Sequence, residues 1–226
     1  MAASISIREG KRLQTRRAVL DAAERLLQAD PSAAFGMREL AAEAGLSFAT
    51  PFNQFGSKGA IMQALSARRI ERMTAIFESA VPVADTVDRV FAAVTVAVTV
   101  MLETSTANRA LVGSLSAPSA VPGAVNEHST SLWSKAVGEG DGLDLPHGLP
   151  TLRMLSHQLA IVFRGCLSFW AAGEIKDDDL LANTRAAAAM AMLALSTGTR
   201  RNDLFLEIIA ERAHSHSAPQ ARSAPI

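Results

Sequence analysis

The sequence predicts an all-α fold of nine or ten helices. Along most of its 226 residues, apolar side chains recur at the spacing of one helical face. No segment shows the sustained alternation that a half-buried strand needs, and the apolar run from Val94 to Val100 fits a helical face better. Because 49% of the residues are hydrophobic and 22 basic residues balance 22 acidic ones, the chain can bury a substantial core.

The first two predicted helices precede a glycine. Thr15 is of a type that caps helices, and Asp30 and Pro31 end the first helix. Its apolar face consists of Val19, Ala22, Ala23, Leu26 and Leu27. The second helix repeats this spacing with Met37, Leu40, Ala41 and Ala44. Gly45 then suits a left-handed turn, which glycine adopts at little cost.

A short third helix and a longer fourth helix are predicted after this turn. Ser47 is placed to cap the third helix, which runs to about Phe55. Pro51 falls in its first turn, where the missing N–H is tolerated. The fourth helix starts near Ser57 and continues to Pro82, where we expect the boundary with a second domain.

Six further helices are predicted in that second domain, the first of them long and amphipathic. A loop rich in Gly, Pro and Asp is expected over residues 138–150, and Gly173 closes the helix that follows it. We expect the helices over residues 87–102, 109–115, 125–137, 151–172, 177–196 and 202–213.

The charges are unevenly distributed along the chain. Residues 1–80 carry eleven Lys and Arg against eight Asp and Glu, whereas the remainder carries eleven against fourteen. Five of the cations lie within the first 17 residues, namely Arg8, Lys11, Arg12, Arg16 and Arg17. Such an arm suits contact with a polyanion, and a merely solvated tail is the alternative.

The composition also bears on the compartment. The single cysteine, Cys166, excludes an intramolecular disulfide and fits a reducing compartment such as the cytoplasm. The uncharged stretch from Val90 to Glu103 is shorter than the roughly 20 residues of a membrane span. The N-terminal cations are not followed by the apolar region of a signal peptide. We therefore expect a cytoplasmic protein that makes no use of a membrane.

Residues 37–58 contain the parts of a helix-turn-helix, with an ordinary three-helix packing unit as the alternative. Such a unit lays its second helix in the major groove of DNA, which is about 12 Å wide. Leu46 and Phe55 would pack that helix on the first one. The exposed face is then expected to consist of Phe48, Ala49, Thr50, Phe52, Asn53 and Gln54.

The segments TRRAVLDAAERLL, MRELAAEAGLS and ATPFNQFGSK, with the helix that follows, resemble the DNA-binding domain of TetR-family transcriptional regulators over residues 15–80. The later segments FWAAGEI and DDDLL and an Ala-rich helix resemble the family's last two core helices, which form a four-helix bundle at the dimer interface. The resemblance implies a basic arm over residues 1–14, a helix-turn-helix domain over 15–60 with a connecting helix over 57–80, an effector-binding and dimerisation domain over 81–213, and a disordered tail over 214–226.

The resemblance also implies roles for individual residues. Thr50 and Lys58 would contact phosphates, and Asn53 and Gln54 would face bases. Phe52 stands where the family usually has Tyr, so it would keep only an apolar contact, and Gly36 stands where Ser or Thr often caps the second helix, so its phosphate contact would come from the backbone only. The expected DNA-binding residues are Arg16, Arg38, Ser47, Phe48, Ala49, Thr50, Phe52, Asn53, Gln54 and Lys58.

By the same resemblance, the second domain would bind a small effector between its helices. A ligand site needs apolar faces with an occasional polar group. The candidates are Phe91, Met101, Trp133, Met154, His157 and Phe163, with His157 as a polar anchor, and each of them is alternatively plain core. The absence of Tyr and the scarcity of acidic residues on these helices argue against a site for cationic drugs.

Other features have simpler interpretations. Asp177, Asp178 and Asp179 at a helix start are expected to cap it and to meet its dipole rather than to bind a metal. Cys166 and His157 are nine residues apart on one predicted helix, about 13.5 Å along its axis, which is too far for a catalytic pair. We find no nucleophile, base and orienting group that converge, so we do not expect an enzyme or a cofactor.

The sequence therefore predicts a homodimeric DNA-binding regulator with a pseudo-palindromic operator. By the resemblance, we expect a repressor that a small molecule releases from its operator. The alternative is a DNA-binding regulator that acts as an activator or responds to a protein partner, with no small-molecule effector.

Overall fold

The computed structural model describes residues 2–30, 32, 35–80, 85–116 and 123–216. These residues form helices and no strand, as the sequence predicts, with one isolated antiparallel bridge between Leu143 and Ser196. The helices are α1 (Ala2–Ala29), α2 (Met37–Glu43), α3 (Ala49–Phe55), α4 (Lys58–Ala80), α5 (Thr86–Glu103), α6 (Ser105–Ser114), α7 (Val125–Val137), α8 (Leu149–Ala171), α9 (Asp177–Leu193) and α10 (Gly198–His216).

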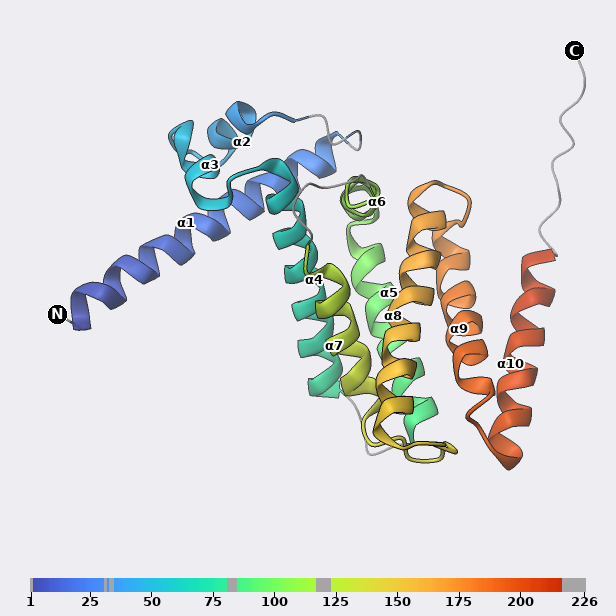
Figure 1. Ribbon diagram of the computed structural model, residues 1–226. Coiled ribbons are helices and arrows are strands. Elements are labelled where there is room, and N and C mark those ends of the chain that lie inside the picture. The colour runs from blue at the N-terminus through green and yellow to red at the C-terminus, as the bar shows by residue number, and fades with distance from the viewer. Residues whose placement is uncertain (1, 31, 33–34, 81–84, 117–122, 217–226) are drawn as a thin grey trace, which may run out of the picture.

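The helices build two parts (Figure 1). α4, α5, α7, α8, α9 and α10 stand side by side as an upright bundle, and α1 projects away from it with α2 and α3 on its outer side. α6 lies across the end of the bundle nearest α1. α4 belongs to both parts, because its first half packs on α1 while its second half packs on α5 and α7.

The smaller hydrophobic core lies between α1, α2, α4 and α6. α1 contributes the apolar face predicted from the sequence, of which Val19, Ala22 and Ala23 are completely buried. Ile61 and Leu65 come from α4, and α6 adds its own apolar side to this core with Ala107, Ala110 and Leu111. The helix α6 therefore couples the N-terminal helices to the bundle.

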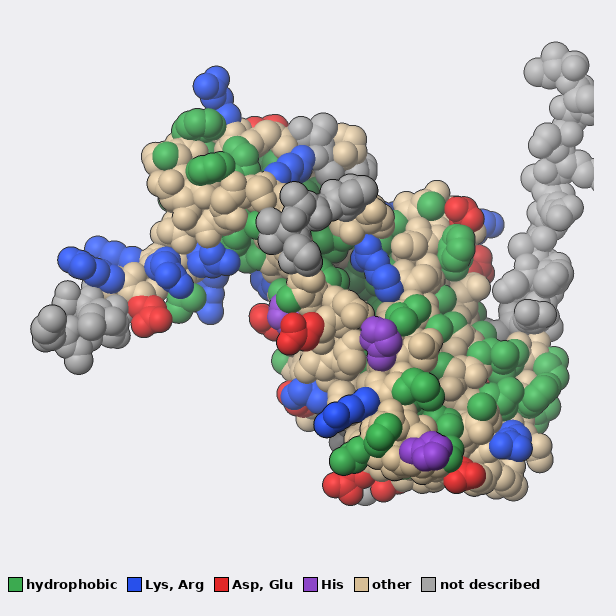
Figure 2. All heavy atoms as spheres, in the orientation of Figure 1, with side chains coloured by type: hydrophobic (Ala, Val, Ile, Leu, Met, Phe, Trp, Pro, Cys, Tyr) green, Lys and Arg blue, Asp and Glu red, His purple; other side chains and the backbone are tan. Residues whose placement is uncertain are grey.

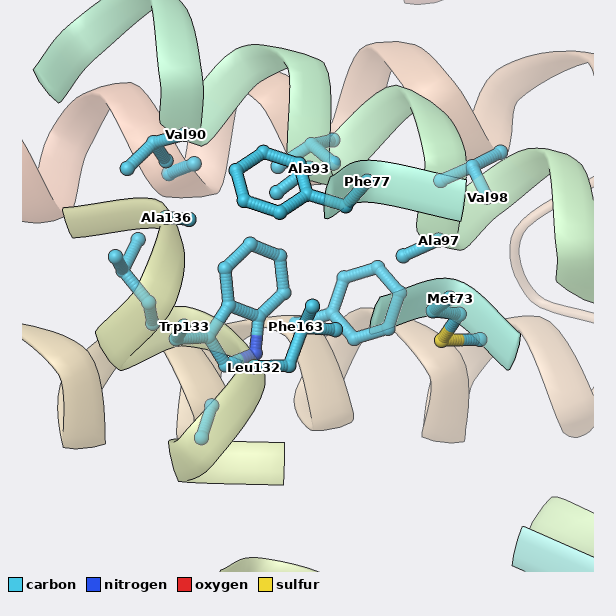
Figure 3. Close-up of a cluster of buried hydrophobic side chains, with 14 of the residues drawn as sticks. Met73, Phe77, Val90, Ala93, Ala97, Val98, Leu132, Trp133, Ala136 and Phe163 are labelled. Carbon is cyan, nitrogen blue, oxygen red and sulfur yellow. The ribbon is translucent and has the colours of Figure 1, made fainter. Parts of the chain in front are cut away.

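The larger core fills the bundle and contains both tryptophans. Trp133 of α7 packs edge to face against Phe163 of α8, with 5.2 Å between ring centroids. Phe77, Val90, Ala93 and Ala97 cover the opposite side of this pair (Figure 3). Such aromatic pairs contribute about 0.5–1.5 kcal/mol beyond their buried area.

Several predicted helix starts were wrong. Thr15 is no cap, because α1 already begins at Ala2, and its hydroxyl donates to the carbonyl of Lys11 within the helix. Phe48 rather than Ser47 holds the N-cap position of α3, with no side-chain cap. Lys176 precedes α9, and Asp177 bonds instead to Arg109 and Trp170. α1 thus extends well before Thr15, α3 begins two residues after Ser47, and α9 already includes Asp177.

Other boundaries shift by a few residues. α6 begins at Ser105 rather than near residue 109, and α9 ends at Leu193. α10 runs through His216, so the predicted tail begins within a helix, while residues 217–226 lie outside the described part of the chain. Pro31 and Pro82, the predicted helix ends, lie outside it too.

Among the described helices, none is by itself long and apolar enough to cross a membrane. α5 and α6 meet those criteria only when taken together, and they are bent by 102° at their junction.

Candidate nucleic-acid interface and internal cavity

The turn between α2 and α3 is held by backbone geometry that needs a glycine. Gly45 has φ +66°, a conformation in which a side chain would be strained. Its N–H donates to the Ala42 carbonyl at 3.0 Å, and the N–H of Leu46 donates to the Ala41 carbonyl at 2.9 Å. These two bonds form a Schellman-type helix end, which turns the chain sharply into α3.

The short helix α3 is fixed at both ends. The hydroxyls of Ser47 and Thr50 lie 2.7 Å apart, and the N–H of Thr50 donates to the Ser47 carbonyl at 2.9 Å. Pro51 is buried against the neighbouring helices. At the other end Gly56 adopts φ +78°, which lets α4 begin at once with the Ser57 hydroxyl accepting from the N–H of Ala60.

One face of α3 and its preceding turn is turned to solvent although it carries large apolar groups. Phe48 and Phe52 are 60% and 61% exposed. Ala49 and Asn53 beside them are exposed as well, while Thr50 and Gln54 are half-buried. Exposed aromatic rings cost hydration energy without helping the fold, and they are typical of a surface that meets a partner.

Cations flank this face. The guanidinium of Arg38 lies 5.5 Å from the centroid of the Phe48 ring, and Arg38 itself is exposed. Figure 2 shows Lys and Arg side chains gathered along the α1 arm, beside the α2–α3 unit. Contact of a helix face with a polyanion such as DNA requires this combination of an exposed helix and nearby positive charge.

Arg16 and Lys58, both expected to contact DNA, also hold the domain together. Arg16 donates to the Gln54 carbonyl at 2.6 Å and stacks 4.1 Å from the centroid of the Phe55 ring, so it attaches α3 to α1. Lys58 donates to the Phe35 carbonyl at 2.8 Å and lies 4.2 Å from the centroid of that ring. Burial lowers the pKa of the Lys58 ammonium. Sequence reasoning gave these two side chains only a DNA-binding role.

A cavity of about 310 Å³, partly open to solvent, lies between α4, α5, α6, α7 and α8. Three of the six candidate ligand-binding residues line it, namely Met101, Trp133 and Phe163. The other three do not. Met154 and His157 point to solvent from α8, and Phe91 lies under the guanidinium of Arg185, 4.3 Å from its ring centroid. His157 therefore cannot anchor a molecule in this cavity as the structure stands.

The polar groups of the cavity wall come from residues that the sequence did not single out. Arg69 of α4 and Arg164 of α8 are its charged members, and no Asp, Glu or His lines it among the described residues. Gln63, Ser66, Asn126 and Ser129 add uncharged polar groups. Arg164 within the largely apolar α8 was the available signal, but periodicity alone could not show that it shares a cavity with Arg69.

Arg69 connects the cavity to the N-terminal helices. It is only 9% exposed, forms an ion pair with Glu24 of α1, and donates from Nε to the Asn108 side chain at 3.0 Å. Asn108 in turn donates to the Met101 carbonyl at 2.8 Å. Arg68 joins the same cluster with ion pairs of 2.5 Å to Asp21 and Glu24. Because the buried Arg69 contacts both α1 and α6, a displacement of α4 at this residue would also displace those helices.

A further unpartnered surface lies on the last three helices. Large apolar side chains on them are 46–67% exposed. Figure 2 shows a group of hydrophobic side chains over α10 on the visible face. The exposed residues are Leu149, Met154, Ile161 and Phe169 of α8, Met190 of α9, and Phe205, Leu206 and Ile209 of α10.

Asp177 and Cys166 have structural partners. The Asp177 carboxylate accepts from the Trp170 indole at 2.8 Å and from Arg109 at 2.6 Å, and the bond from Trp170 is the main cause of its lowered pKa. The Cys166 thiol donates to the Asn183 carbonyl at 3.9 Å, and burial raises the pKa of this thiol. The described residues contain no group of three side chains that could hold a metal ion.

Comparison with known proteins identifies the N-terminal helices. Residues 19–65 match the family model of bacterial regulatory proteins of the tetR family. No curated protein matches the sequence significantly. Among solved structures, a TetR transcriptional regulator from Rhodococcus sp. RHA1 shares the fold with a TM-score of 0.68 at 22% identity, over 81% of this chain and 99% of that one. A protein assigned to the tetR family of transcription regulators, from Shewanella sp. PV-4, gives a TM-score of 0.53 at 16% identity over the same shares.

Proposed function

We propose that this chain is a TetR-family transcriptional regulator, because its N-terminal helices match the family model and its fold is that of a solved TetR regulator. It acts as a repressor that binds a pseudo-palindromic operator as a homodimer. It leaves the operator when a small molecule occupies the cavity. Proteins of this family are transcription factors and not enzymes. The observation that carries the proposal is the exposed face of α3 with Phe48, Phe52 and Asn53, beside the cations of α1 and α2. We place its action in the cytoplasm, where the DNA lies.

In this proposal α3 enters the major groove. Asn53 and Gln54 would read base edges, because their amide groups donate and accept together. Phe48, Ala49 and Phe52 would contact apolar edges such as thymine methyl groups. The hydroxyls of Ser47 and Thr50, with Arg38 and the cations of α1, would contact phosphates and fix the register of the helix.

The exposed apolar residues of α8 and α9 support a dimer formed by a second copy of the chain. A two-fold axis beside these helices would bury the same residues from both subunits, as an isologous interface requires. It would also leave both α3 helices free to meet two half-sites separated by about one helical turn of DNA or a multiple of it.

The position of the cavity supports control by a ligand. α4 carries residues of both cores, with Ile61 and Leu65 in the smaller and Met73 and Phe77 in the larger one. A ligand that holds α4 and α6 in a different position would therefore move the α2–α3 unit. If that position does not fit the operator spacing, the ligand lowers DNA affinity by linkage without touching DNA.

A second candidate function is that of an activator, or of a regulator controlled by a protein partner without a small molecule. The exposed residues of α10 favour this candidate, because they extend the apolar surface beyond α8 and α9.

Selection of genome fragments by the purified protein at two salt concentrations tests the DNA-binding proposal. We expect enrichment of a palindromic sequence whose affinity falls steeply with salt, because phosphate contacts release counterions. Enrichment of no sequence, with equally weak binding to all fragments, would refute it. The enriched sites then serve to test release by candidate ligands and the direction of regulation.

A further inference from the structure

We infer that the cavity binds a hydrophobic monoanion, that is, a molecule with an apolar body and one carboxylate. The carboxylate pairs with Arg164, and an oxygen of the ligand accepts from the indole N–H of Trp133. This inference rests on the proposed ligand control, and it names the class of ligand. It follows from the charges and the unused hydrogen-bond donor of the cavity wall.

Arg164 is a cation without an acidic partner among the described residues. Its guanidinium donates to two neutral acceptors, the Val112 carbonyl at 3.1 Å and the Ser116 hydroxyl at 3.3 Å. Burial lowers its pKa, which shows that the surroundings disfavour the charge that the side chain carries. An anion in the cavity would supply the missing countercharge, and a planar carboxylate matches the guanidinium fork.

Arg69 is a less suitable partner for that anion. It already has the carboxylate of Glu24 and the amide oxygen of Asn108 as partners. Arg69 is therefore the structural cation, whereas Arg164 is the one that can bind a ligand.

Trp133 provides an independent observation. The residue is 1% exposed, and its Nε1 is a buried donor with no hydrogen-bond partner within the described structure. Figure 3 shows the nitrogen edge of the indole on the side of Leu132 and Phe163, both of which line the cavity, and away from Phe77 and Val90. A buried donor without a partner costs free energy, and a ligand oxygen would remove that cost.

The remainder of the wall determines the body of the ligand. Ile70, Met73, Met101, Leu132, Phe163 and Leu167 present apolar surface. No acidic group faces the cavity among the described residues, so an ammonium would find no partner there and would meet two arginines. The volume of about 310 Å³ lies at the lower end of the range for small-molecule sites.

Calorimetric titration without DNA tests the inference. The probes are a series of aryl-alkyl carboxylates such as 4-phenylbutyrate, each compared with its primary amide and with the amine of equal length. We expect carboxylates of the best-fitting length to bind at least about tenfold more tightly than their amides, and amines not to bind.

Two substitutions assign the contacts. Arg164→Gln should remove the preference for carboxylate over amide, and Trp133→Phe, which keeps an aromatic ring but loses the N–H, should weaken carboxylate binding by about three- to tenfold. Arg153→Gln is the matched control, because Arg153 lies on the same helix, is exposed and does not line the cavity. Circular dichroism and thermal unfolding show that each variant is folded.

Equal binding of carboxylates and amides by the unmodified protein would overturn the inference, as would no binding of any carboxylate. A preference that survives in Arg164→Gln would overturn the assignment of Arg164. If carboxylates bind selectively but do not release DNA, the ligand class stands and the proposed switch fails. If the protein selects no DNA yet binds carboxylates, the inference again stands without the proposed function.

Discussion

Arg69, in the wall of the internal cavity, forms an ion pair with Glu24 of α1, 45 positions earlier in the chain. Glu24 is shared with Arg68, whose guanidinium lies 2.5 Å from it and also pairs with Asp21. The cluster thus joins the cavity wall to the helix that supports the α2–α3 unit. Any ligand that moves Arg69 must change the contacts of α1.

The first prediction concerns this cluster. Glu24→Gln should leave ligand binding to the free protein within about threefold but should reduce the effect of the ligand on DNA affinity, because the charge that couples Arg69 to α1 is lost. Coupling between two sites is typically worth about 1–3 kcal/mol, which corresponds to about a five- to 150-fold change in affinity. If this contact carries the coupling, the factor by which a saturating ligand weakens DNA binding should fall by about that amount. Fluorescence anisotropy with labelled operator, with and without ligand, measures it.

Glu43→Gln is the control for that substitution. Glu43 pairs with Arg25 at 2.5 Å within the N-terminal helices and does not touch the cavity. The control should retain full release. Normal release by Glu24→Gln would show that the signal passes through α6 or along α4 instead.

The second prediction separates base reading from phosphate contact. Asn53→Ala should change the preferred base at one operator position at a cost of about 1–3 kcal/mol, since a bidentate amide contact would be lost. Arg17→Ala, on the exposed side of α1, should weaken binding equally on all sequences and reduce the salt slope by about one. Competition binding at four salt concentrations distinguishes the two effects, and equal loss on all DNAs for both variants would contradict the assignment.

Lys58→Ala is a poor probe of phosphate contact. The Lys58 ammonium donates to the Phe35 carbonyl, so its removal should also lower the stability of the N-terminal helices. A loss of DNA binding in this variant would therefore combine two causes. Thermal unfolding of Lys58→Ala, expected at a lower temperature than for the unmodified protein, checks the structural part.

The third prediction is a gain of affinity. Phe52 is 61% exposed on α3 and lacks the hydroxyl of the tyrosine that is usual at this position in the TetR family, which residues 15–80 resemble. Phe52→Tyr should strengthen binding to all DNA sequences by about two- to tenfold, because one hydrogen bond to phosphate contributes about 0.5–1.5 kcal/mol. Anisotropy titrations on specific and random duplexes measure this, and an unchanged affinity on both would place residue 52 away from the backbone.

The fourth prediction concerns the proposed dimer. Met190 is 57% exposed on α9, and Met190→Glu should shift the protein to monomers because a carboxylate would be buried between the subunits. Sedimentation velocity measures the change. Leu13→Glu, at a similarly exposed apolar residue of α1, should remain dimeric. A Met190→Glu variant that stays dimeric would show that the interface lies elsewhere. Leu193 is unsuitable for this substitution because it is half-buried against the larger core.

The fifth prediction concerns pH and stability. Asp85 caps α5 by accepting from the N–H of Asp88 at 3.0 Å and pairs with Arg200 of α10 at 2.8 Å. The bond from Arg200 is the main cause of the lowered pKa of Asp85. Because the folded-state pKa of Asp85 is depressed, its carboxylate contributes to the free energy of unfolding above the ordinary pKa of about 3.9. This contribution is lost as the pH falls through the folded-state pKa.

Asp85→Ala should therefore lower the free energy of unfolding by about 1–2 kcal/mol near pH 7, and the difference from the unmodified protein should narrow below about pH 4. Asp85→Asn should cost less, since asparagine also caps helices. Urea unfolding at pH 7 and pH 3 measures both. A difference that is the same at both pH values would show that the ion pair with Arg200 contributes nothing.

The sequence by itself determined the local structure of this protein. The spacing of Val19, Ala22 and Ala23 indicated the buried face of α1, and Gly45 marked the turn before α3. These features were predictable because helix periodicity and the left-handed conformation of glycine act over a few residues. The resemblance over residues 15–80 rests on the same local pattern, which is why the α2–α3 unit and four of its six expected exposed residues could be predicted, whereas Thr50 and Gln54 are half-buried.

Only the tertiary structure decided which helix faces meet and what lies between them. His157 and Met154 fit an apolar helix by spacing but face solvent, whereas Arg69 and Arg164 face the cavity. Periodicity shows which residues share a face and not which neighbour that face meets. The pairing of Arg69 with Glu24 depends on the packing of α1, α4 and α6, and contacts between residues so far apart in the chain leave no local pattern from which the sequence could predict them.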